Sequence, residues 1–317
     1  MNLILPVPIA RRFTILLCFT VTSLSAGGAT AKSPISLDVL QRDGYGSVKL
    51  IKGWRNNTLF VPAEINARKI DLLLDTGWSS SDGITVGLNP SELHIVPEKG
   101  MQMGRSINGT RTPMGHGIAQ SVVMGNMHVQ NTRIYFGRFA GSGFLSHGFL
   151  KRSNAIIDLT NLRLYLRPPG VGRRVNLGPA LTSVGLTEVP IINAPDGSFA
   201  LNVEVNGVPT QMALDTGSQI SELDVRFAKM ASTKGWGRRN VYQEDVAGVL
   251  SPADFAGTKT FKIDGIPIRT PTVLVTRFAG YDLTRGKMVG VLGLDVIGLN
   301  WGIIDIAQQK FYFAKAN

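Results

Sequence analysis

The chain has 317 residues, of which 44% are hydrophobic, and it contains 36 glycines and 16 prolines. This length and apolar content exclude a disordered chain and allow two domains with hydrophobic cores. The formal net charge is +11 at pH 7, but the basic residues are scattered without interleaved aromatic side chains, so nucleic-acid binding is not predicted. Frequent glycine and proline among Val, Ile and Thr indicate short strands and tight turns, and hence an all-β fold class.

The first 31 residues have the features of a secretory signal peptide. An arginine pair at residues 11–12 precedes an apolar stretch at 13–24, and small residues at 29–31 suit cleavage. The apolar stretch is shorter than the roughly 20 residues that a spanning helix needs, although an uncleaved membrane anchor is the alternative. We therefore expect an exported protein, periplasmic or secreted, with no integral membrane span after cleavage. The sole cysteine, Cys18, lies in this segment, so the mature chain is expected to lack disulfides.

A strand that ends at Asp-Thr-Gly occurs twice, once at Asp75 and once at Asp215. Each copy is preceded by a predicted β-hairpin, in the same place and without a gap. The predicted strands are residues 58–65 and 69–74 before Asp75, and residues 199–205 and 210–214 before Asp215. Because the flanking hairpins match as well as the triplets, we interpret the two stretches as one element that occurs in two copies.

The segments that follow the triplets differ. Ser221 to Asp224 resembles a capping box and predicts a short helix through about Ser232, whereas residues 82–100 are interrupted by glycine and proline. Two turn signals then stand at similar distances, and both are candidate flap hairpins over a cleft, although such turns are common in any β protein. The turn residues, which are also candidate substrate-binding residues, are Asn108 and Gly109 in the first copy and Ala247 and Gly248 in the second.

The ends of the two copies also match. A hairpin is predicted around Gly125-Asn126 and another around Asp264-Gly265, and each is followed by an apolar segment and an Ile-Ile-Asp strand that ends at Asp158 or Asp305. The duplication therefore spans whole lobes, with the Pro-Pro-Gly stretch after Arg167 as the junction. The expected divisions are a signal peptide at 1–31, a lead-in at 32–54, a first lobe at 55–167, a linker at 168–178 and a second lobe at 179–317.

These motifs resemble the retropepsin-like aspartic protease family, with two units in tandem over roughly residues 55–317. The resemblance rests on the two Asp-Thr-Gly triplets, on Gly143-Phe-Leu and Gly290-Val-Leu-Gly, and on the two Ile-Ile-Asp strands. It implies a bilobal acid-protease fold of the pepsin and retropepsin kind, with two pseudo-symmetric β-barrel-like lobes and a cleft between them. Two positions depart from the family pattern: Ser146 stands in the place of Gly293, and Trp78 follows the first triplet where Ala, Ser or Thr is usual.

The resemblance implies that Asp75 and Asp215 form a catalytic dyad. Two close carboxyl groups cannot both ionise readily, so one can accept a proton from water while the other donates a proton to the carbonyl oxygen. The expected supporting roles are a lock between the two turns by the threonine hydroxyls, close approach of backbone amides at the glycines, and a hydrogen bond to the outer oxygen of Asp215. The supporting residues are Thr76, Gly77, Thr216, Gly217 and Ser218.

Trp78 has three interpretations: it lines a substrate subsite and narrows it, it plugs the cleft, or it is a packed aromatic beside the dyad. Asp158 and Asp305 are expected to be structural carboxylates at the start of the closing strands. Four histidines, at 94, 116, 128 and 147, lack paired ligand spacing, and the sequence has no nucleophile-elbow or phosphate-loop motif. We therefore expect no metal and no cofactor.

The resulting prediction is an aspartic endopeptidase that hydrolyses an extended polypeptide in the interlobe cleft. The alternative is a non-catalytic protein that uses the same scaffold to bind a peptide or a cell-envelope partner. Because one chain supplies both aspartates, a monomer is sufficient to form the site.

Overall fold

The computed structural model describes residues 36–53, 58–78, 83–106, 109–139, 141–168, 175–194, 197–235, 241–245, 247–279, 288–298 and 302–315. All of them belong to one compact unit, Pro34–Asn317. The predicted signal peptide lies outside the described residues. Within those residues, no helix has both the length and the apolar character needed to cross a membrane.

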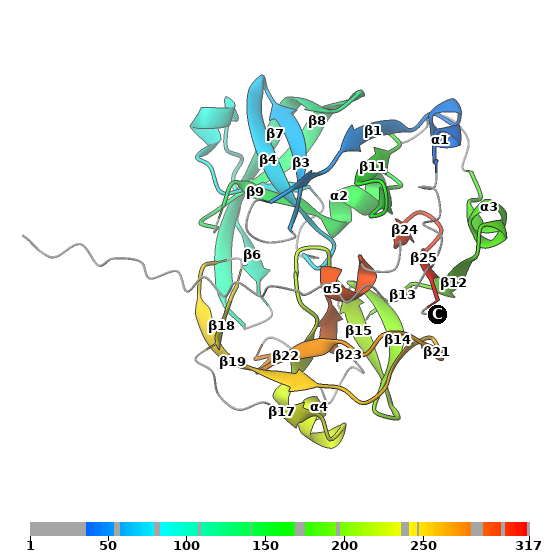
Figure 1. Ribbon diagram of the computed structural model, residues 1–317. Coiled ribbons are helices and arrows are strands. Elements are labelled where there is room, and N and C mark those ends of the chain that lie inside the picture. Colours follow the sequence, from blue (N-terminus) through cyan, green and yellow to red (C-terminus); the bar gives the residue numbers. More distant parts are fainter. Residues whose placement is uncertain are drawn as a thin grey trace, which may run out of the picture. The chain divides into compact units, whose positions relative to one another are not determined.

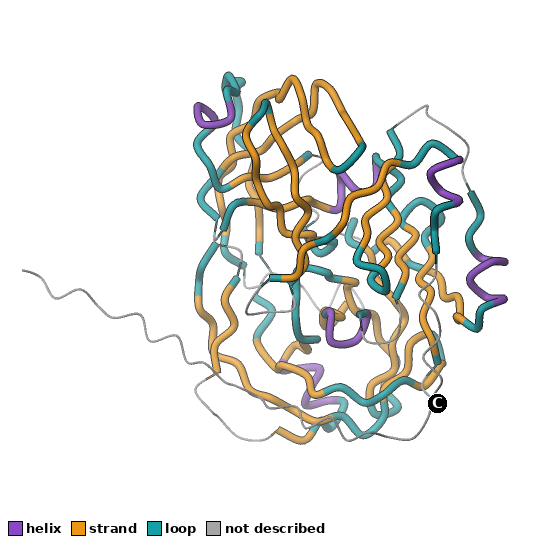
Figure 2. The backbone as a smooth tube through the Cα atoms, turned by 45° about the horizontal axis from the view of Figure 1, so that its top comes forward, coloured by secondary structure: helices purple, strands orange, loops and turns teal. Residues whose placement is uncertain are grey.

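Strands predominate, and the fold class is all-β, as the sequence predicts (Figure 2). The described residues form three sheets. The first has the order β2-β3-β4-β9-β5-β8-β7-β6. Its strands are β2 (Ile51–Lys52), β3 (Leu59–Ile65), β4 (Arg68–Asp75), β5 (Ile84–Val86), β6 (Gln102–Arg105), β7 (Arg111–Met124), β8 (Met127–Phe136) and β9 (Gly143–Ser146).

The second sheet has the order β17-β19-β22-β16-β23-β15-β14-β20-β21, with β13 paired to β14 and β18 to β19. Its strands are β13 (Ile192–Asn193), β14 (Phe199–Val205), β15 (Val208–Leu214), β16 (Glu222–Asp224), β17 (Lys234–Gly235), β18 (Val241–Glu244), β19 (Leu250–Gly257), β20 (Phe261–Ile263), β21 (Ile266–Pro267), β22 (Thr272–Thr276) and β23 (Met288–Leu292). Figure 1 shows the first sheet in blue to green and the second in green to orange.

The third sheet takes strands from both predicted lobes and from the lead-in, in the order β1-β11-β10-β24-β25-β12. Its strands are β1 (Gly46–Lys49), β10 (Ile156–Asp158), β11 (Arg163–Leu166), β12 (Leu186–Pro190), β24 (Ile303–Asp305) and β25 (Lys310–Ala314). The two Ile-Ile-Asp strands pair antiparallel at its centre, where Ile157 and Ile304 lie opposite each other and are fully buried. The closing strands of the two copies therefore join the copies to each other.

The hairpin before each Asp-Thr-Gly triplet is present, close to the predicted bounds. β3 pairs with β4 and β14 with β15, and each pair is closed by a two-residue turn. Both turn residues have positive φ in each case, 46° and 69° at Asn66 and Ala67, and 50° and 83° at Asn206 and Gly207. This is the backbone of a type I′ turn, whose twist matches that of the flanking strands. The hairpins predicted at Gly125-Asn126 and Asp264-Gly265 are present too.

Helices are short throughout the described residues. They are α1 (Val39–Arg42), α2 (His147–Arg152), α3 (Gly178–Ser183), α4 (Val225–Met230), α5 (Leu294–Ile297) and the 3-10 turn Pro90–Leu93. α2 follows β9 and α5 follows β23, so the ends of the two copies correspond in structure as well as in sequence.

The helix predicted to begin at Ser221 begins later, and the prediction is wrong in its first turn. Glu222 to Asp224 form β16, which lies between β22 and β23, and all three side chains are buried. The cap of α4 is Asp224, whose Oδ1 accepts a hydrogen bond of 2.8 Å from the Arg226 amide. Burial between two strands fixes these residues as a strand, whatever the local capping pattern favours.

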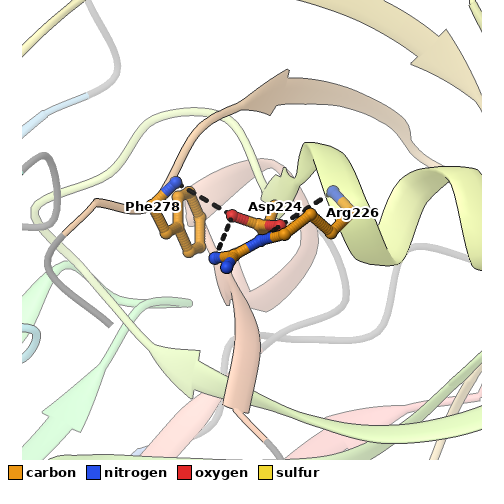
Figure 3. A network of polar contacts seen from close by, with 3 residues as sticks. All are labelled: Asp224, Arg226 and Phe278. Carbon is orange, nitrogen blue, oxygen red and sulfur yellow. Dashed lines mark hydrogen bonds and ion pairs between the residues drawn. The ribbon is translucent and has the colours of Figure 1, made fainter. Parts of the chain in front are cut away.

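Asp224 also holds the chain that follows β22. Its Oδ2 accepts hydrogen bonds from Arg226 Nη2 at 3.1 Å and from the Phe278 amide at 3.0 Å, as Figure 3 shows. Burial raises the pKa of Asp224, but the hydrogen bonds from Arg226 and Phe278 outweigh burial and hold the pKa below its usual value. The ionised carboxylate therefore stabilises the fold.

We expect Asp224→Asn to lower the free energy of unfolding at pH 7 by about 1–3 kcal/mol, because a buried hydrogen-bond acceptor and its charge are lost. A carboxyl with a depressed folded pKa stabilises the protein above its unfolded pKa, and this contribution is lost as the pH falls through the folded pKa. Urea unfolding of both proteins should therefore show a difference that shrinks between pH 5 and pH 2. Asp71→Asn, at an exposed position on β4, is the control; an Asp224→Asn effect independent of pH contradicts the assignment.

Candidate active site

Two buried strands bring the aspartates of the triplets together. Asp75 is the last residue of β4, which pairs in parallel with β9, and Asp215 directly follows β15, which pairs in parallel with β23. The Asp215 amide donates to the Leu292 carbonyl at 3.0 Å, so the turn starts while the chain is still held by the sheet. Each carboxyl group is therefore placed by a strand in the middle of its sheet.

The two triplets are tied to each other by their threonines, as predicted. Thr76 Oγ1 donates to the Leu214 carbonyl at 2.8 Å, and Thr216 Oγ1 donates to the Leu74 carbonyl at 2.7 Å. Each hydroxyl oxygen also accepts a hydrogen bond from the amide of the other threonine. The Thr216 amide donates to Thr76 Oγ1 at 2.9 Å, and the Thr76 amide donates to Thr216 Oγ1 at 3.2 Å. Both threonines are fully buried. Four reciprocal hydrogen bonds thus fix the distance between the two turns.

The carboxyl groups face each other across two glycines. A Cβ atom on Gly77 would lie 2.5 Å from Asp215 Cγ, and one on Gly217 would lie 2.9 Å from Asp75 Cγ. Any side chain there would collide with the opposite carboxyl group, which is why both positions need glycine. The amides of Trp78 and Gly217 donate at 2.8 Å to Asp75 Oδ1 and Asp215 Oδ1 respectively.

The two carboxyl groups are not electrostatically equal. Burial raises the pKa of both, and the charge of Asp215 raises the pKa of Asp75 further, to well above its usual value. Backbone hydrogen bonds oppose the rise at both groups: Asp75 accepts them from Trp78 and Gly77, and Asp215 from Gly217, Ser218 and Gly77. The two carboxyl groups therefore share one proton, and the pKa of Asp75 is raised the more strongly.

Ser218 lies beside Asp215, but its side chain does not take the expected part. The hydroxyl donates to the Ile220 carbonyl at 2.8 Å and lies 3.4 Å from Glu222 Oε1. The hydrogen bond to Asp215 comes from the Ser218 backbone amide. The prediction that the Ser218 hydroxyl donates to the outer oxygen of Asp215 is thus wrong, since this hydroxyl donates to the Ile220 carbonyl instead.

Trp78 is 5% exposed and packs against the first sheet beside the site. It forms a cluster with Met114, Tyr135 and Phe139, and its ring centroid is 5.8 Å from those of Phe139 and Phe144. A Cβ on Gly104 of β6 would lie 2.7 Å from the indole, so β6 closes over the ring. Trp78 also lines the cleft. Trp78 is therefore a packed aromatic side chain, and it also borders the cleft where a substrate subsite is expected.

Ser146, which stands in the place of Gly293, is accommodated without disturbing the site. A Cβ on Gly293 would lie 2.7 Å from the backbone of Ile220, so the second copy needs glycine. In the first copy the Ser146 hydroxyl is buried and donates to the Gly83 carbonyl. This departure from the family pattern therefore forms a hydrogen bond within the first copy.

Two hairpins approach the cleft, one from each copy, at the positions predicted for flaps. β6 pairs with β7 and β18 with β19, and Figure 1 shows β6 and β18 on the same side of the molecule. Ser106 Oγ donates to Asp245 Oδ2 at 2.8 Å, so the hairpins are joined by a hydrogen bond between two buried side chains. Gly109, Ala247 and Gly248 lie in the hairpin turns, and Asn108 is outside the described residues.

The cleft encloses about 350 Å³ and is bounded by both aspartates and both hairpins. Residues from both hairpins line it, whereas Gly109, Ala247 and Gly248, the described turn residues predicted for substrate binding, are not among its lining residues. Its lining residues include Leu73, Asp75, Trp78, Arg105, Ser106, Ala213, Asp215, Ser218, Glu222, Tyr242, Gln243, Glu244, Asp245, Leu274 and Val291.

Glu222 is the cleft residue that sequence reasoning misplaced, because its position after Ser221 matches a capping box. It is 5% exposed, and its Oε1 accepts a hydrogen bond of 3.0 Å from Gln243 Nε2. Its Oε2 has no hydrogen-bond partner among the described residues. Burial, with the nearby charge of Asp215, raises the pKa of Glu222 to about 8. All three residues of β16 are buried, so the sequence carries no alternating pattern that would mark them as a strand.

The carboxylates of Asp158 and Asp305, expected to be structural, have partners close by in the chain. Asp158 accepts hydrogen bonds from the Thr160 and Asn161 amides, and Asp305 accepts one from the Gln308 amide, so both hold the turns after their strands. In the part of the chain that the structure describes, no group of three or more His, Cys, Asp or Glu side chains is placed to hold a metal ion.

Comparisons with known proteins agree with this geometry. Residues 201–296 match the family model described as aspartyl protease, which covers most of the second copy. The fold matches the crystal structure of an aspartic proteinase from Irpex lacteus with a TM-score of 0.51 and 13% sequence identity, over 86% of this chain and 98% of that chain. No curated protein sequence matches the chain. The bilobal acid-protease fold expected from the sequence is thereby confirmed.

Removing both carboxyl groups should change how stability depends on pH. A carboxyl with a raised folded pKa favours the folded state only while protonated, so its contribution is lost as the pH rises from its unfolded pKa through its folded pKa. The double variant Asp75→Asn/Asp215→Asn should therefore melt on the order of a few °C above the parent protein at pH 8, with the gap narrowing toward pH 4. Melting temperatures measured across this range test it. A gap of equal size at every pH contradicts the raised pKa values.

Trp78→Ala should lower the free energy of unfolding by about 3–5 kcal/mol, because a large buried ring is removed from a packed cluster. The measurement is urea unfolding at pH 6. Tyr242→Ala, at a position that is 57% exposed, is expected to cost less than about 1 kcal/mol. Equal effects of the two changes would show that Trp78 contributes no more to packing than an exposed aromatic side chain.

Proposed function

We propose that the protein is an aspartic endopeptidase that hydrolyses peptide bonds of an extended polypeptide, with Asp75 and Asp215 as its catalytic residues. The observation that carries the proposal is the pair of carboxyl groups held face to face by the reciprocal threonine hydrogen bonds. The match of residues 201–296 to aspartyl proteases supports membership of that family. We further propose that the chain is a tandem retropepsin-like protein, exported by its N-terminal segment.

The mechanism follows from the unequal carboxyl groups. A water molecule between them loses a proton to ionised Asp215 as its oxygen attacks the carbonyl carbon, while protonated Asp75 donates a hydrogen bond and then its proton to the carbonyl oxygen. The tetrahedral intermediate collapses when Asp215 gives the proton that it took from water to the amide nitrogen, the C–N bond breaks, and a hydroxyl of the intermediate returns a proton to Asp75 as the carboxylic acid product forms. No covalent enzyme intermediate forms. The partly buried setting strengthens each of these interactions, because little water competes for the charges.

The two hairpins suit an extended substrate. β6 and β18 border the cleft, and Arg105 and Ser106 from one and residues 242–245 from the other line it. A polypeptide in the cleft can pair with the main chain of these strands, while its alternate side chains enter pockets on either side. The Ser106–Asp245 hydrogen bond must break or rearrange for a chain to enter, so it acts as a closure between the hairpins.

A second candidate function is binding of a peptide or cell-envelope partner without hydrolysis. Two observations favour it: Trp78 occupies space beside Asp75, and the hairpins are joined over the cleft. Neither removes a group that the hydrolytic mechanism requires. The two functions make opposite predictions for turnover.

We expect the purified protein to cleave a mixed peptide library, most rapidly in the acidic to mildly acidic range. Activity falls as the pH rises, because the shared proton is lost from Asp75, and falls at low pH, because Asp215 becomes protonated. Asp75→Asn and Asp215→Asn should each reduce kcat/KM by at least about 10³-fold. Cleavage should be inhibited by pepstatin-like compounds and unaffected by chelators.

Thr187→Ala, on β12 of the third sheet, is the control for purification and folding and should cleave at the parental rate. Full activity of Asp215→Asn refutes the catalytic assignment. Peptide binding without turnover at any pH establishes the second candidate function instead.

A further inference from the structure

A row of paired residues crosses the second sheet at the wall of the cleft. The strand order β22-β16-β23-β15 places Glu222 opposite Leu274 on one side and opposite Val291 on the other, and Val291 opposite Ala213. Residues directly opposite in neighbouring strands project from the same face of a sheet. All four line the cleft, and Glu222 is the ionisable member of the row.

The first sheet has an equivalent row of paired residues, but a different side chain covers it. The corresponding pairs join Tyr135 to Thr85, Thr85 to Phe144, and Phe144 to Leu73. Here Trp78 packs against Phe144 and clusters with Tyr135, so an indole covers the row. Trp78 and Ser218 each follow their Asp-Thr-Gly triplet. Because serine is small, the second row remains open to the cleft at Glu222.

Two buried acceptor atoms at the open row have no hydrogen-bond partner in the part of the chain that the structure describes. These are Glu222 Oε2 and Gln243 Oε1, and the two side chains are joined by the hydrogen bond from Gln243 Nε2 to Glu222 Oε1. A buried acceptor that has lost water and gained no donor costs free energy. Since the acceptors belong to neighbouring side chains, a ligand group with several N–H donors can satisfy both.

The charge around the row selects a cation among such donors. The cleft is lined by the carboxyl groups of Asp75, Asp215, Glu222, Glu244 and Asp245, and by the single basic side chain of Arg105 among the described residues. A positive group beside Glu222 offsets the repulsion between Glu222 and Asp215. A neutral amide supplies donors but leaves that repulsion in place.

We propose that the row is a subsite for a lysine or arginine side chain of the polypeptide substrate. The Glu222 pocket, defined as Ala213, Ser218, Glu222, Gln243, Leu274 and Val291, would hold the aliphatic stem against Ala213, Leu274 and Val291, with the charged end at Glu222 and Gln243. The inference rests on the proposed function for its substrate class. It makes the enzyme's preference asymmetric, because Trp78 closes the matching position in the first copy.

The occupant of the Glu222 pocket sets a distinct pH dependence. Free Glu222 has a pKa of about 8, because of burial and the charge of Asp215, whereas a bound cation favours the ionised form. Selectivity for the cation should therefore increase as the pH rises toward 8. The other charged and titratable groups that face Glu222 or share its cleft are Asp295, Tyr242, Glu244, Asp245 and Arg105.

The test uses a peptide that the parent protein cleaves, with each residue near the scissile bond replaced in turn by lysine, glutamine or norleucine. Norleucine keeps an unbranched aliphatic stem without the charge. At one position kcat/KM for lysine should exceed that for norleucine by about 10- to 100-fold, the effect of one charge-assisted interaction. Glu222→Gln should reduce this ratio to below about 3-fold. Glu64→Gln, at a half-buried position on β3 away from the cleft, is the matched control and should retain it.

Binding to the full-length Asp75→Asn protein, measured by fluorescence anisotropy with the same peptides, separates this inference from the proposed function. Lysine-selective binding that is lost on adding Glu222→Gln supports the pocket even if no peptide is cleaved. Cleavage or binding with equal affinity for lysine and norleucine at every position overturns it. So does a lysine preference that survives Glu222→Gln and Glu222→Leu, or one equalled by glutamine.

Discussion

The structure depends on holding two carboxyl groups face to face at the wall of the cleft. Each group alone is costly to bury, and the charge of one opposes ionisation of the other. Two sets of hydrogen bonds offset the free-energy cost of this arrangement. The reciprocal hydrogen bonds of Thr76 and Thr216 fix the turns, and backbone amides donate to the carboxyl oxygens. Glycine is required at 77 and 217 because a Cβ atom at either position would collide with the opposite aspartate. The remaining strands place these two turns.

The two copies differ where they face the cleft, and the difference begins at one position after each triplet. Trp78 fills its side of the site and is covered by β6, while Ser218 leaves the row with Glu222 open. An approximately symmetric scaffold thus carries an asymmetric binding surface. Asymmetry also appears in the dyad, where Asp215 accepts more backbone hydrogen bonds than Asp75 and the pKa of Asp75 is raised the more strongly.

The hairpins over the cleft connect the two copies at a third place, besides the threonines of the triplets and the third sheet. Ser106 and Asp245 are buried where the hairpins meet, and Asp245 is held further by the amides of Ala247 and Val249. The turn of the second hairpin therefore holds the Asp245 acceptor in place for the hydroxyl of Ser106.

The sequence by itself determined the matching hairpins before each triplet, and the resemblance that its motifs carry predicted that Asp75 and Asp215 pair. These features are local or repeated, so turn residues such as Asn206-Gly207 and the strand alternation encode them directly. Only the tertiary structure decided that Glu222 lies in a strand, that the Ser218 hydroxyl bonds to Ile220, and that Trp78 both packs and lines the cleft. Each of these depends on neighbours distant in the chain: β22 and β23 around Glu222, Asp295 and Gln243 near it, and β6 over Trp78. Burial by such neighbours overrides local propensity, and a single sequence does not record which neighbours those are.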